Sequence, residues 1–328
     1  MGGDLSLTLL IALIGVALLF DFLNGLHDAA NAIATVVSTR VLSPQLAVCW
    51  AAFFNFIAFL FFGLHVANTI GTGIINPHDV TSAVIFSALI GAITWILGIP
   101  SSSSHALIGG LLGAGIAKTG IGTVVWSGVT KTVFGIFLAP LLGMVVALML
   151  VLVVAWLFRR VNANKADRIF RRGQLFTSAL YSLGHGGNDA QKTMGIIAVL
   201  LYSQHMLEGE FHVPFWVVLA CQAAMGLGTL MGGWRIVHTM GSKITRITPR
   251  EGVCAEAGGS IMLFGATWLG IPVSTTHTIT GSIMGVGAAR RATAVRWGVA
   301  GNIVIAWFIT LPASAAIAAL TFWITRLF

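Results

Sequence analysis

Long apolar segments occupy most of this chain and limit what it can fold into. Only 9% of its 328 residues are charged, whereas soluble domains carry about 25%. So little polar surface cannot face water on all sides, so a bilayer is the expected solvent. Backbone groups must then be satisfied within each segment, which predicts helices. The segments run roughly over residues 7–24, 45–63, 80–98, 103–117, 124–157, 175–203, 213–234, 252–270, 274–289 and 298–325.

Four short polar or helix-breaking stretches interrupt this pattern. At membrane depth, such stretches survive only inside the protein or against a water-filled cavity. We therefore expect discontinuous helices and re-entrant hairpins around a buried polar site. The four stretches are Asn24 to Asn31, Pro100 to His105, Gly184 to Lys192 and Pro272 to His277.

The interruptions come in matching pairs. The stretch IPSSSSHALIGGLLGAG at residues 99–115 aligns without a gap on IPVSTTHTITGSIMGVG at residues 271–287. In the other pair of stretches, Asn24 to Asn31 and Gly184 to Lys192, Asp28 aligns with Asp189. The chain is therefore predicted to be a duplicated unit. Its first repeat covers residues 1–158, a basic linker covers 159–172, and a second repeat covers 173–328.

The basic residues predict how the repeats are oriented. Six of the 18 Lys and Arg lie between Arg159 and Arg172, and cytoplasmic loops are rich in these residues. With this linker inside, all but four of the 18 fall in the cytoplasm; Lys118 and Arg326 fall outside, and Lys131 and Lys192 lie within spans. The repeats are then inverted, with both termini extracytoplasmic and about 10–12 membrane segments, as in many secondary transporters. The net charge of +8 thus reflects topology, and no nucleic-acid partner is expected.

Several charged residues lie within the predicted spans, where each costs about 2.5–3.5 kcal/mol. Asp28 and Asp189 occupy equivalent positions of the two repeats. We expect them to bind a coupling cation or proton, although aspartate also caps helices. Glu256 and His27 are further coupling candidates, and Lys192, one turn beyond Asp189, is a candidate partner of that residue.

Two runs of hydroxyl residues each follow a proline and lead into a glycine-rich helical segment. A helix N-terminus there would offer free N–H groups and a partial positive charge. Two such ends that converge would bind a tetrahedral oxyanion. Plain N-capping is the alternative, but the symmetric repetition favours substrate contact. The runs are Ser102, Ser103 and Ser104, followed by His105, and Ser274, Thr275 and Thr276, followed by His277.

The motifs NGLHDAANAIATVVSTR at residues 24–40, GHGGNDAQKTMG at residues 184–195 and the run ending LGIPVSTTH at His277 resemble signatures of the inorganic phosphate transporter (PiT) family. The resemblance implies a symporter of orthophosphate with sodium ions or protons, and some members carry a metal–phosphate complex. Asp28, Asn31, Asn188, Asp189 and the two hydroxyl runs match the family's motifs, and Asp28 and Asp189 are the implied Na⁺ ligands.

Two positions depart from the family pattern. His27 stands where many members have Asn. A histidine at this position resembles certain bacterial proton-coupled members and argues against a sodium site there. The first hydroxyl run is SSSSH, where many members have Ser–Gly–Thr–His.

Taken together, these features predict an all-α, multi-pass protein of the cell (plasma or inner) membrane that carries inorganic phosphate with H⁺ or Na⁺ and needs no other cofactor.

A sulfate permease on the same fold stays open as an alternative, because sulfate is also tetrahedral. A membrane lipid-pyrophosphate phosphatase would need an arginine at the phosphate, and no arginine lies in the four polar stretches. No hydrolase or ATPase motif is present, so no enzyme is expected. Glycine-rich apolar faces would permit a homodimer.

Overall fold

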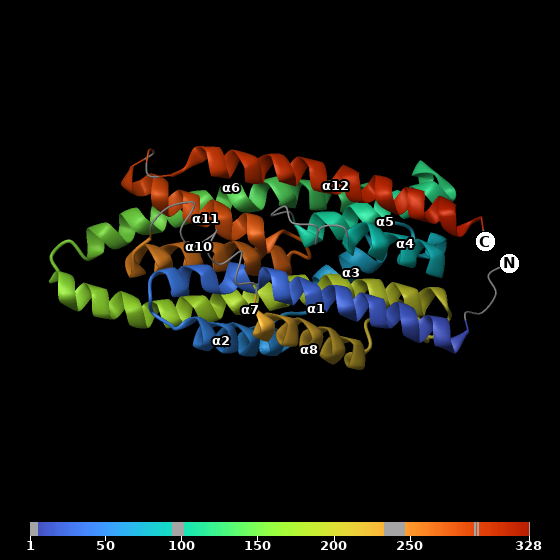
Figure 1. The fold of residues 1–328 in the computed structure, drawn as a ribbon, viewed down its shortest axis with the longest axis horizontal. Helices are drawn as coiled ribbons and strands as arrows, with labels where there is room; N and C mark the ends of the chain where they lie inside the picture. Colours follow the sequence, from blue (N-terminus) through green and yellow to red (C-terminus); the bar gives the residue numbers. More distant parts are fainter. Residues whose placement is uncertain (1–5, 94–101, 233–246, 292, 294, 328) are drawn as a thin grey trace.

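The fold is a bundle of α-helices (Figure 1). A computed structural model describes residues 6–93, 102–232, 247–291, 293 and 295–327. The all-α prediction is confirmed. The helices of the described chain are α1 (Leu7–Ser38), α2 (Pro44–Ile57), α3 (His65–Thr72), α4 (Ser82–Ile93), α5 (Ser103–Thr119), α6 (Trp126–Leu157), α7 (Ala163–Ser203), α8 (Phe215–Met231), α10 (Pro249–Trp268), α11 (Thr275–Arg290) and α12 (Trp297–Thr325), with short 3₁₀ turns at Ala58–Leu60, Pro77–Asp79 and Ile121–Thr123.

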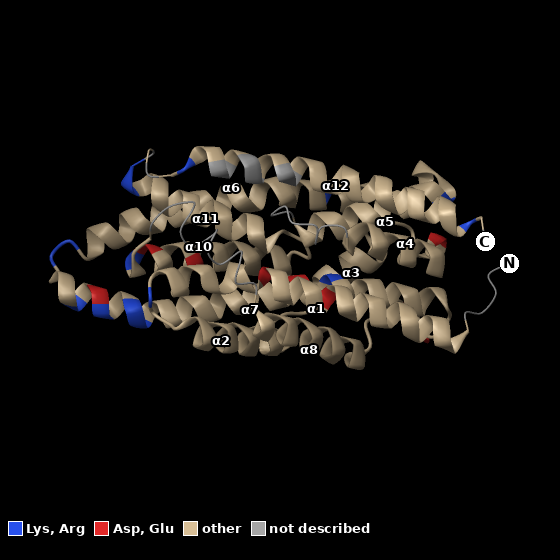
Figure 2. Ribbon diagram, viewed as in Figure 1, with Lys and Arg blue, Asp and Glu red and all other residues tan. Residues whose placement is uncertain are grey.

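Most helices lie along the long axis of the molecule, and the two termini lie at the end opposite the turn between α6 and α7 (Figure 1). Lys and Arg gather at the end of the molecule where that turn lies (Figure 2). The basic segment is mostly helical, because α7 begins at Ala163. At 41 residues, α7 is about 60 Å long, and its basic first turns can therefore extend beyond a hydrocarbon core of about 30 Å.

Some helices qualify as membrane spans by length and composition alone. Among the described residues, these are Leu7–Ser38, Trp126–Leu157 and Phe308–Thr325. The pair Pro44–Leu60 and His65–Thr72, bent by 78°, qualifies jointly. The others are shorter or more polar, as suits hairpin segments and helices that line a polar interior.

The two repeats pack in the same way and run in opposite directions. α5 packs against α12 as α11 packs against α6, and α1 packs against α8 as α7 packs against α2. The hairpin of α4 and α5 corresponds to that of α10 and α11. α1 starts at the end that holds the termini, whereas α7 starts at the opposite end (Figure 1). This arrangement is an inverted repeat whose halves interlock, since each repeat supplies helices that pack against the other.

Two GxxxG motifs, one in each repeat, allow the interlocking helices to touch through their backbones. A Cβ on Gly109 or Gly113 of α5 would lie 2.3 or 2.0 Å from a carbonyl oxygen of α12. A Cβ on Gly281 or Gly285 of α11 would lie 2.1 Å from a carbonyl oxygen of α6. In lipid there is no hydrophobic force between helices, so such close packing holds them together.

The sequence prediction was wrong for two of the four interruptions. The stretches Asn24 to Asn31 and Gly184 to Lys192 lie inside the unbroken helices α1 and α7. Glycine and asparagine weaken a helix by only about 1 kcal/mol or less each, and here the glycines allow close packing. A Cβ on Gly25 would lie 2.2 Å from the Met225 carbonyl oxygen, and one on Gly186 would lie 2.4 Å from that of Asn55.

The chain does leave the helix at the second pair of interruptions. α10 ends at Trp268 and α11 begins at Thr275, with a turn at Gly270, whose φ of +65° favours glycine. This is the re-entrant hairpin that the sequence predicts. In the first repeat, α5 begins at Ser103, but Pro100 and Ser101 lie outside the described residues, as do Arg235, Lys243 and Arg246.

Residues 64–79, which lie between two of the predicted apolar segments, contain a half-buried helix, α3. Its first N–H groups, those of Val66 and Ala67, donate to Gln191 Oε1 at 3.0 and 3.2 Å. Because this cap comes from α7, far away in the sequence, no local pattern marks it.

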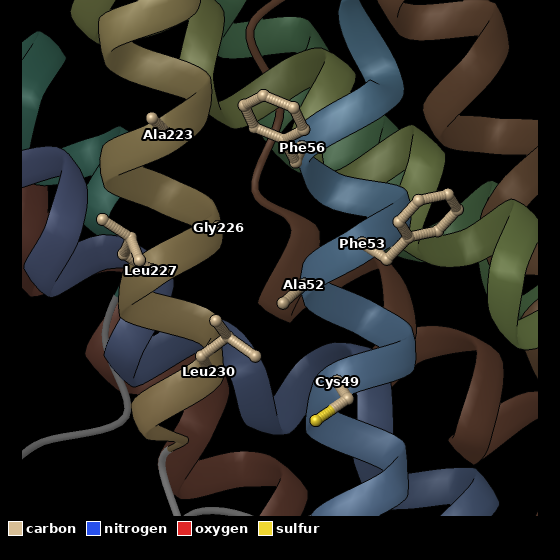
Figure 3. Close-up of a pocket in the computed structure, with 8 residues that line it drawn as sticks. All are labelled: Cys49, Ala52, Phe53, Phe56, Ala223, Gly226, Leu227 and Leu230. Carbon is tan, nitrogen blue, oxygen red and sulfur yellow. The ribbon is translucent and has the colours of Figure 1, made fainter.

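An apolar groove lies between α2 and α8 on the outside of the bundle (Figure 3). Phe53, Leu227 and Leu230 on its walls are exposed, as suits a surface that faces lipid. The side chains that line it carry no group that could bind an anion. They are Cys49, Ala52, Phe53, Phe56, Ala223, Gly226, Leu227 and Leu230.

We expect Gly281→Val to lower the free energy of unfolding by about 2 kcal/mol or more, since the new side chain would overlap the carbonyl of Pro140. Thermal unfolding of the purified protein in detergent measures this change. Gly265→Val is the matched control, because nothing lies within 4 Å of a Cβ at Gly265. Equal melting temperatures for the two variants would contradict the close contact of α11 with α6.

Candidate functional site

The N-termini of α5 and α11 meet in the interior. Ser102 and Ser274 are their N-caps, and each side chain accepts a hydrogen bond of 3.3 Å from the N–H of the histidine three residues later. Those rings, His105 and His277, lie edge to face with centroids 4.5 Å apart. Two partially positive helix ends thus lie side by side, and Ser102 and Ser274 act as ordinary caps.

The two aspartates lie close together beside these helix ends. Asp28 on α1 and Asp189 on α7 are 3% and 1% exposed. One ligand atom each from Asp28, Asp189 and His185 lie within 4.8 Å of one another. The structure therefore brings together the acidic residues that the sequence placed in different repeats. Carboxylate oxygens and a ring nitrogen at this spacing could hold a cation or share a proton.

On the first-repeat side, Asp28 contacts the second hydroxyl run. Thr276 Oγ1 donates to Asp28 Oδ1 at 3.3 Å and accepts from Asn31 Nδ2 at 2.7 Å. His27 Nδ1 lies 3.1 Å from Asp28 Oδ1, and this histidine is partly exposed. The other amide atom of Asn31, Oδ1, has no hydrogen-bond partner among the described residues.

On the second-repeat side, Asp189 is held more tightly. Thr275 Oγ1 donates to Asp189 Oδ2 at 3.0 Å, and His185 Nε2 lies 3.4 Å from the same oxygen. The Lys192 ammonium forms an ion pair with Asp189 Oδ1 and donates to Ser104 Oγ at 2.5 Å. Asp189 is thus neutralised by a fixed positive charge, whereas in the described chain the basic groups near Asp28 are the histidines His27 and His185.

The charges of this cluster do not balance. Two unit charges about 4.8 Å apart repel each other by about 3–4 kcal/mol at an effective dielectric constant of about 20. Lys192 neutralises one of the two carboxylates, which leaves these three side chains with a net charge of −1 when the histidines are neutral. The buried Asp21 interacts electrostatically with Asp189 and Lys192 and adds a further negative charge whenever it is ionised. A buried unpaired charge is costly, so the cluster favours a proton or a small cation at Asp28.

Asn188 holds the turn of the re-entrant hairpin. Its Nδ2 donates to Thr267 Oγ1 at 3.0 Å and to the Ile271 carbonyl at 3.2 Å, and its Oδ1 accepts from the Val273 N–H at 3.2 Å. The side chain therefore positions the start of α11, which carries Thr275 and Thr276.

Glu256 lies in a separate cluster. Its carboxylate accepts from Thr35 Oγ1 at 2.6 Å, from Gln174 Nε2 at 3.0 Å and from Thr177 Oγ1. In the described chain, no hydrogen bond joins Glu256 to Asp28 or Asp189. The sequence grouped it with the coupling residues, but the structure joins α10 to α1 and α7 through it.

Tyr181 carried no sequence signal for the site, whereas His185, which flanks the second acidic stretch, is a predicted proton carrier. His185 belongs to the acidic cluster, and its Nδ1 lies 3.3 Å from Asn55 Oδ1 of α2. Tyr181 donates to the Thr275 carbonyl at 2.8 Å. Tyr181 and His185 lie eight and four residues before Asp189 on the same helix, and this spacing could have suggested a shared face, but their hydrogen-bond partners come from other helices.

We expect Asn188→Ala to lower the free energy of unfolding by about 1–3 kcal/mol, because it leaves buried polar groups of the hairpin unpaired. Chemical or thermal unfolding in detergent measures the change. Asn164→Ala, on the exposed first turn of α7, should stay within about 0.5 kcal/mol of the wild type. An Asn188→Ala variant as stable as Asn164→Ala would show that this residue does not hold the hairpin.

Known proteins resemble this chain over nearly its whole length. The model described as "Phosphate transporter family" matches residues 24–166 and 158–318. A protein of Rhizobium meliloti (strain 1021) named "Probable low-affinity inorganic phosphate transporter" is 68% identical, over 98% of each chain. One of the same name from Bacillus subtilis (strain 168) is 45% identical, over 99% of each chain. A solved structure titled "The sodium-dependent phosphate transporter" matches with a TM-score of 0.90 at 27% identity, over 98% of this chain and 100% of that one.

Proposed function

The chain belongs to the phosphate transporter family, and on this premise we propose that it is a symporter that carries inorganic phosphate together with protons or sodium ions. Its relatives are named as transporters and permeases, so it is a transporter and not an enzyme. The cargo is orthophosphate, free or as a metal–phosphate complex.

The unbalanced charge of the aspartate cluster supports symport. With Asp28, Asp189 and Lys192 ionised, the site carries a net charge of −1. A phosphate anion would add one or two negative charges in a place of low dielectric constant. Its entry therefore requires at least one cation or proton. Asp28, with His27 beside it, receives this coupling ion, and Asp189 forms the other wall of the site.

Phosphate would bind where the N-termini of α5 and α11 meet. Ser103, Ser104, Thr275 and Thr276 lie on their first turns, and hydroxyls and backbone N–H groups are suitable donors for phosphate oxygens. Near neutral pH phosphate keeps one or two protons and sulfate keeps none. Carboxylate acceptors at the site therefore favour phosphate over sulfate.

The basic residues at one end of the molecule and the termini at the other (Figure 2) support a cytoplasmic α6–α7 turn and extracytoplasmic termini in the cell membrane. Alternating access then arises when one interlocked bundle moves against the other around the site. The homodimer suggested by the sequence stays a prediction.

Phosphate uptake into proteoliposomes tests this function. We expect uptake of radiolabelled phosphate under a proton or a sodium gradient, with competition from arsenate but not from sulfate. Asp28→Asn should reduce gradient-driven uptake by at least about tenfold, because the neutral amide cannot bind the coupling ion. Asp189→Asn should reduce uptake by a similar factor, because it leaves the buried Lys192 ammonium without its carboxylate partner.

Asp167→Asn is the control, since this aspartate lies on the exposed basic part of α7 and pairs with Arg171. It should transport like the wild type. Normal uptake by both site variants would refute the coupling role of the aspartates. Uptake quenched by sulfate would change the substrate while leaving the transporter in place.

A further inference from the structure

The Lys192 ammonium is surrounded by oxygen atoms in the interior of the bundle. Its side chain is 2% exposed. It contacts a carboxylate oxygen of Asp189, the hydroxyl of Ser104 at 2.5 Å and the carbonyl of Val273 at 2.7 Å. A carboxylate, a hydroxyl and a backbone carbonyl are the kinds of ligand that hard metal cations take in proteins.

The repeat symmetry shows what stands in the equivalent place of the other half. Aligning Asp28 with Asp189 puts Asn31 on Lys192, and aligning the hydroxyl runs puts Thr276 on Ser104. The structure has both equivalent contacts, from Asn31 to Thr276 and from Lys192 to Ser104. The same position therefore carries a neutral amide in one half and a fixed positive charge in the other.

The two halves consequently differ in what they can bind. Beside Asp28, the amide oxygen of Asn31 is a buried acceptor without a hydrogen-bond partner among the described residues. This oxygen, the Asp28 carboxylate and the Thr276 hydroxyl could together receive a cation. Beside Asp189, the three oxygens already surround the ammonium, which is covalently attached and cannot leave with the substrate.

We propose that Lys192 is a built-in cation that takes the place of an exchangeable sodium ion in the second repeat, so that the exchangeable coupling ion binds only in the Asp28 half. This inference rests on the proposed symport and makes Lys192 a residue that determines ion specificity and stoichiometry. Each fixed charge replaces one ion that would otherwise have to enter with phosphate.

Replacing Lys192 with the residue of the other half tests this. In Lys192→Asn, a sodium ion should bind in place of the ammonium, between the oxygens of Asp189, Ser104 and Val273. The ratio of phosphate uptake with sodium to uptake with choline should then exceed the wild-type ratio by at least about tenfold. Purified Lys192→Asn protein in detergent should also melt at a higher temperature in sodium than in choline, with a larger difference than the wild type shows.

Two further variants make the result decisive. Lys118→Asn removes another lysine that donates to a backbone carbonyl, that of Asp79 at 2.6 Å, and should keep the wild-type sodium response. Lys192→Asn combined with Asp189→Asn removes the carboxylate ligand and should lose the added sodium stabilisation. A folded Lys192→Asn protein that transports poorly but gains this stabilisation supports the inference.

The inference is overturned if Lys192→Asn shows the wild-type sodium response in both measurements. It is also overturned if the double variant keeps the added stabilisation, because sodium would then bind elsewhere. Failure of the proposed symport is a separate result. The wild type would then take up no phosphate under either gradient, while the melting measurements would still decide whether Lys192 occupies a cation site.

Discussion

Two buried carboxylates, those of Asp28 and Asp189, have oxygen atoms within 4.8 Å of one another, and the surrounding helices must compensate for their charge. Like charges at that distance inside a membrane are tolerated only where cations and hydrogen-bond donors surround them. The Lys192 ammonium, the hydroxyls of Thr275 and Thr276, and the imidazole of His185 meet this need. Each must come from a helix that reaches the centre of the bundle. The unbroken helices α1 and α7 carry the acids there, and the hairpins carry the hydroxyls.

The inverted repeat explains why these groups meet. Asn31 of the first repeat bonds Thr276 of the second, and Lys192 of the second bonds Ser104 of the first. The site therefore belongs to neither half and exists only where they interlock. Glycines on α5 and α11 bring the backbones of the two halves into contact. A movement of one half against the other would change the polar contacts around the site together, which is what alternating access requires.

The sequence singled out the main residues of the candidate site because their chemistry is exceptional in an apolar chain. Asp28, Asp189 and the two hydroxyl runs stand out against apolar surroundings and recur in both halves, and the structure brings them together. The same reasoning was wrong for the course of α1 and α7. It treated polar residues and glycines as breaks, but a helix can keep them if they face protein rather than lipid. The coupling role of Glu256 stays a prediction. Its partners Thr35, Gln174 and Thr177 come from other parts of the chain, which the sequence does not show.

The order of residues along the chain is enough to show that this protein is helical and membrane-embedded, that it is a duplicated unit, and that its polar residues within the apolar segments fall into a few short motifs. These properties follow from composition and repetition, which are local and can be read along the chain. The packing of the helices shows three further features: α3 is capped by Gln191, Asn188 holds the hairpin turn, and Asp189 is paired with a fixed ammonium while Asp28 is not. Those outcomes depend on contacts between residues that are distant in the sequence, and their geometry arises only when the helices pack.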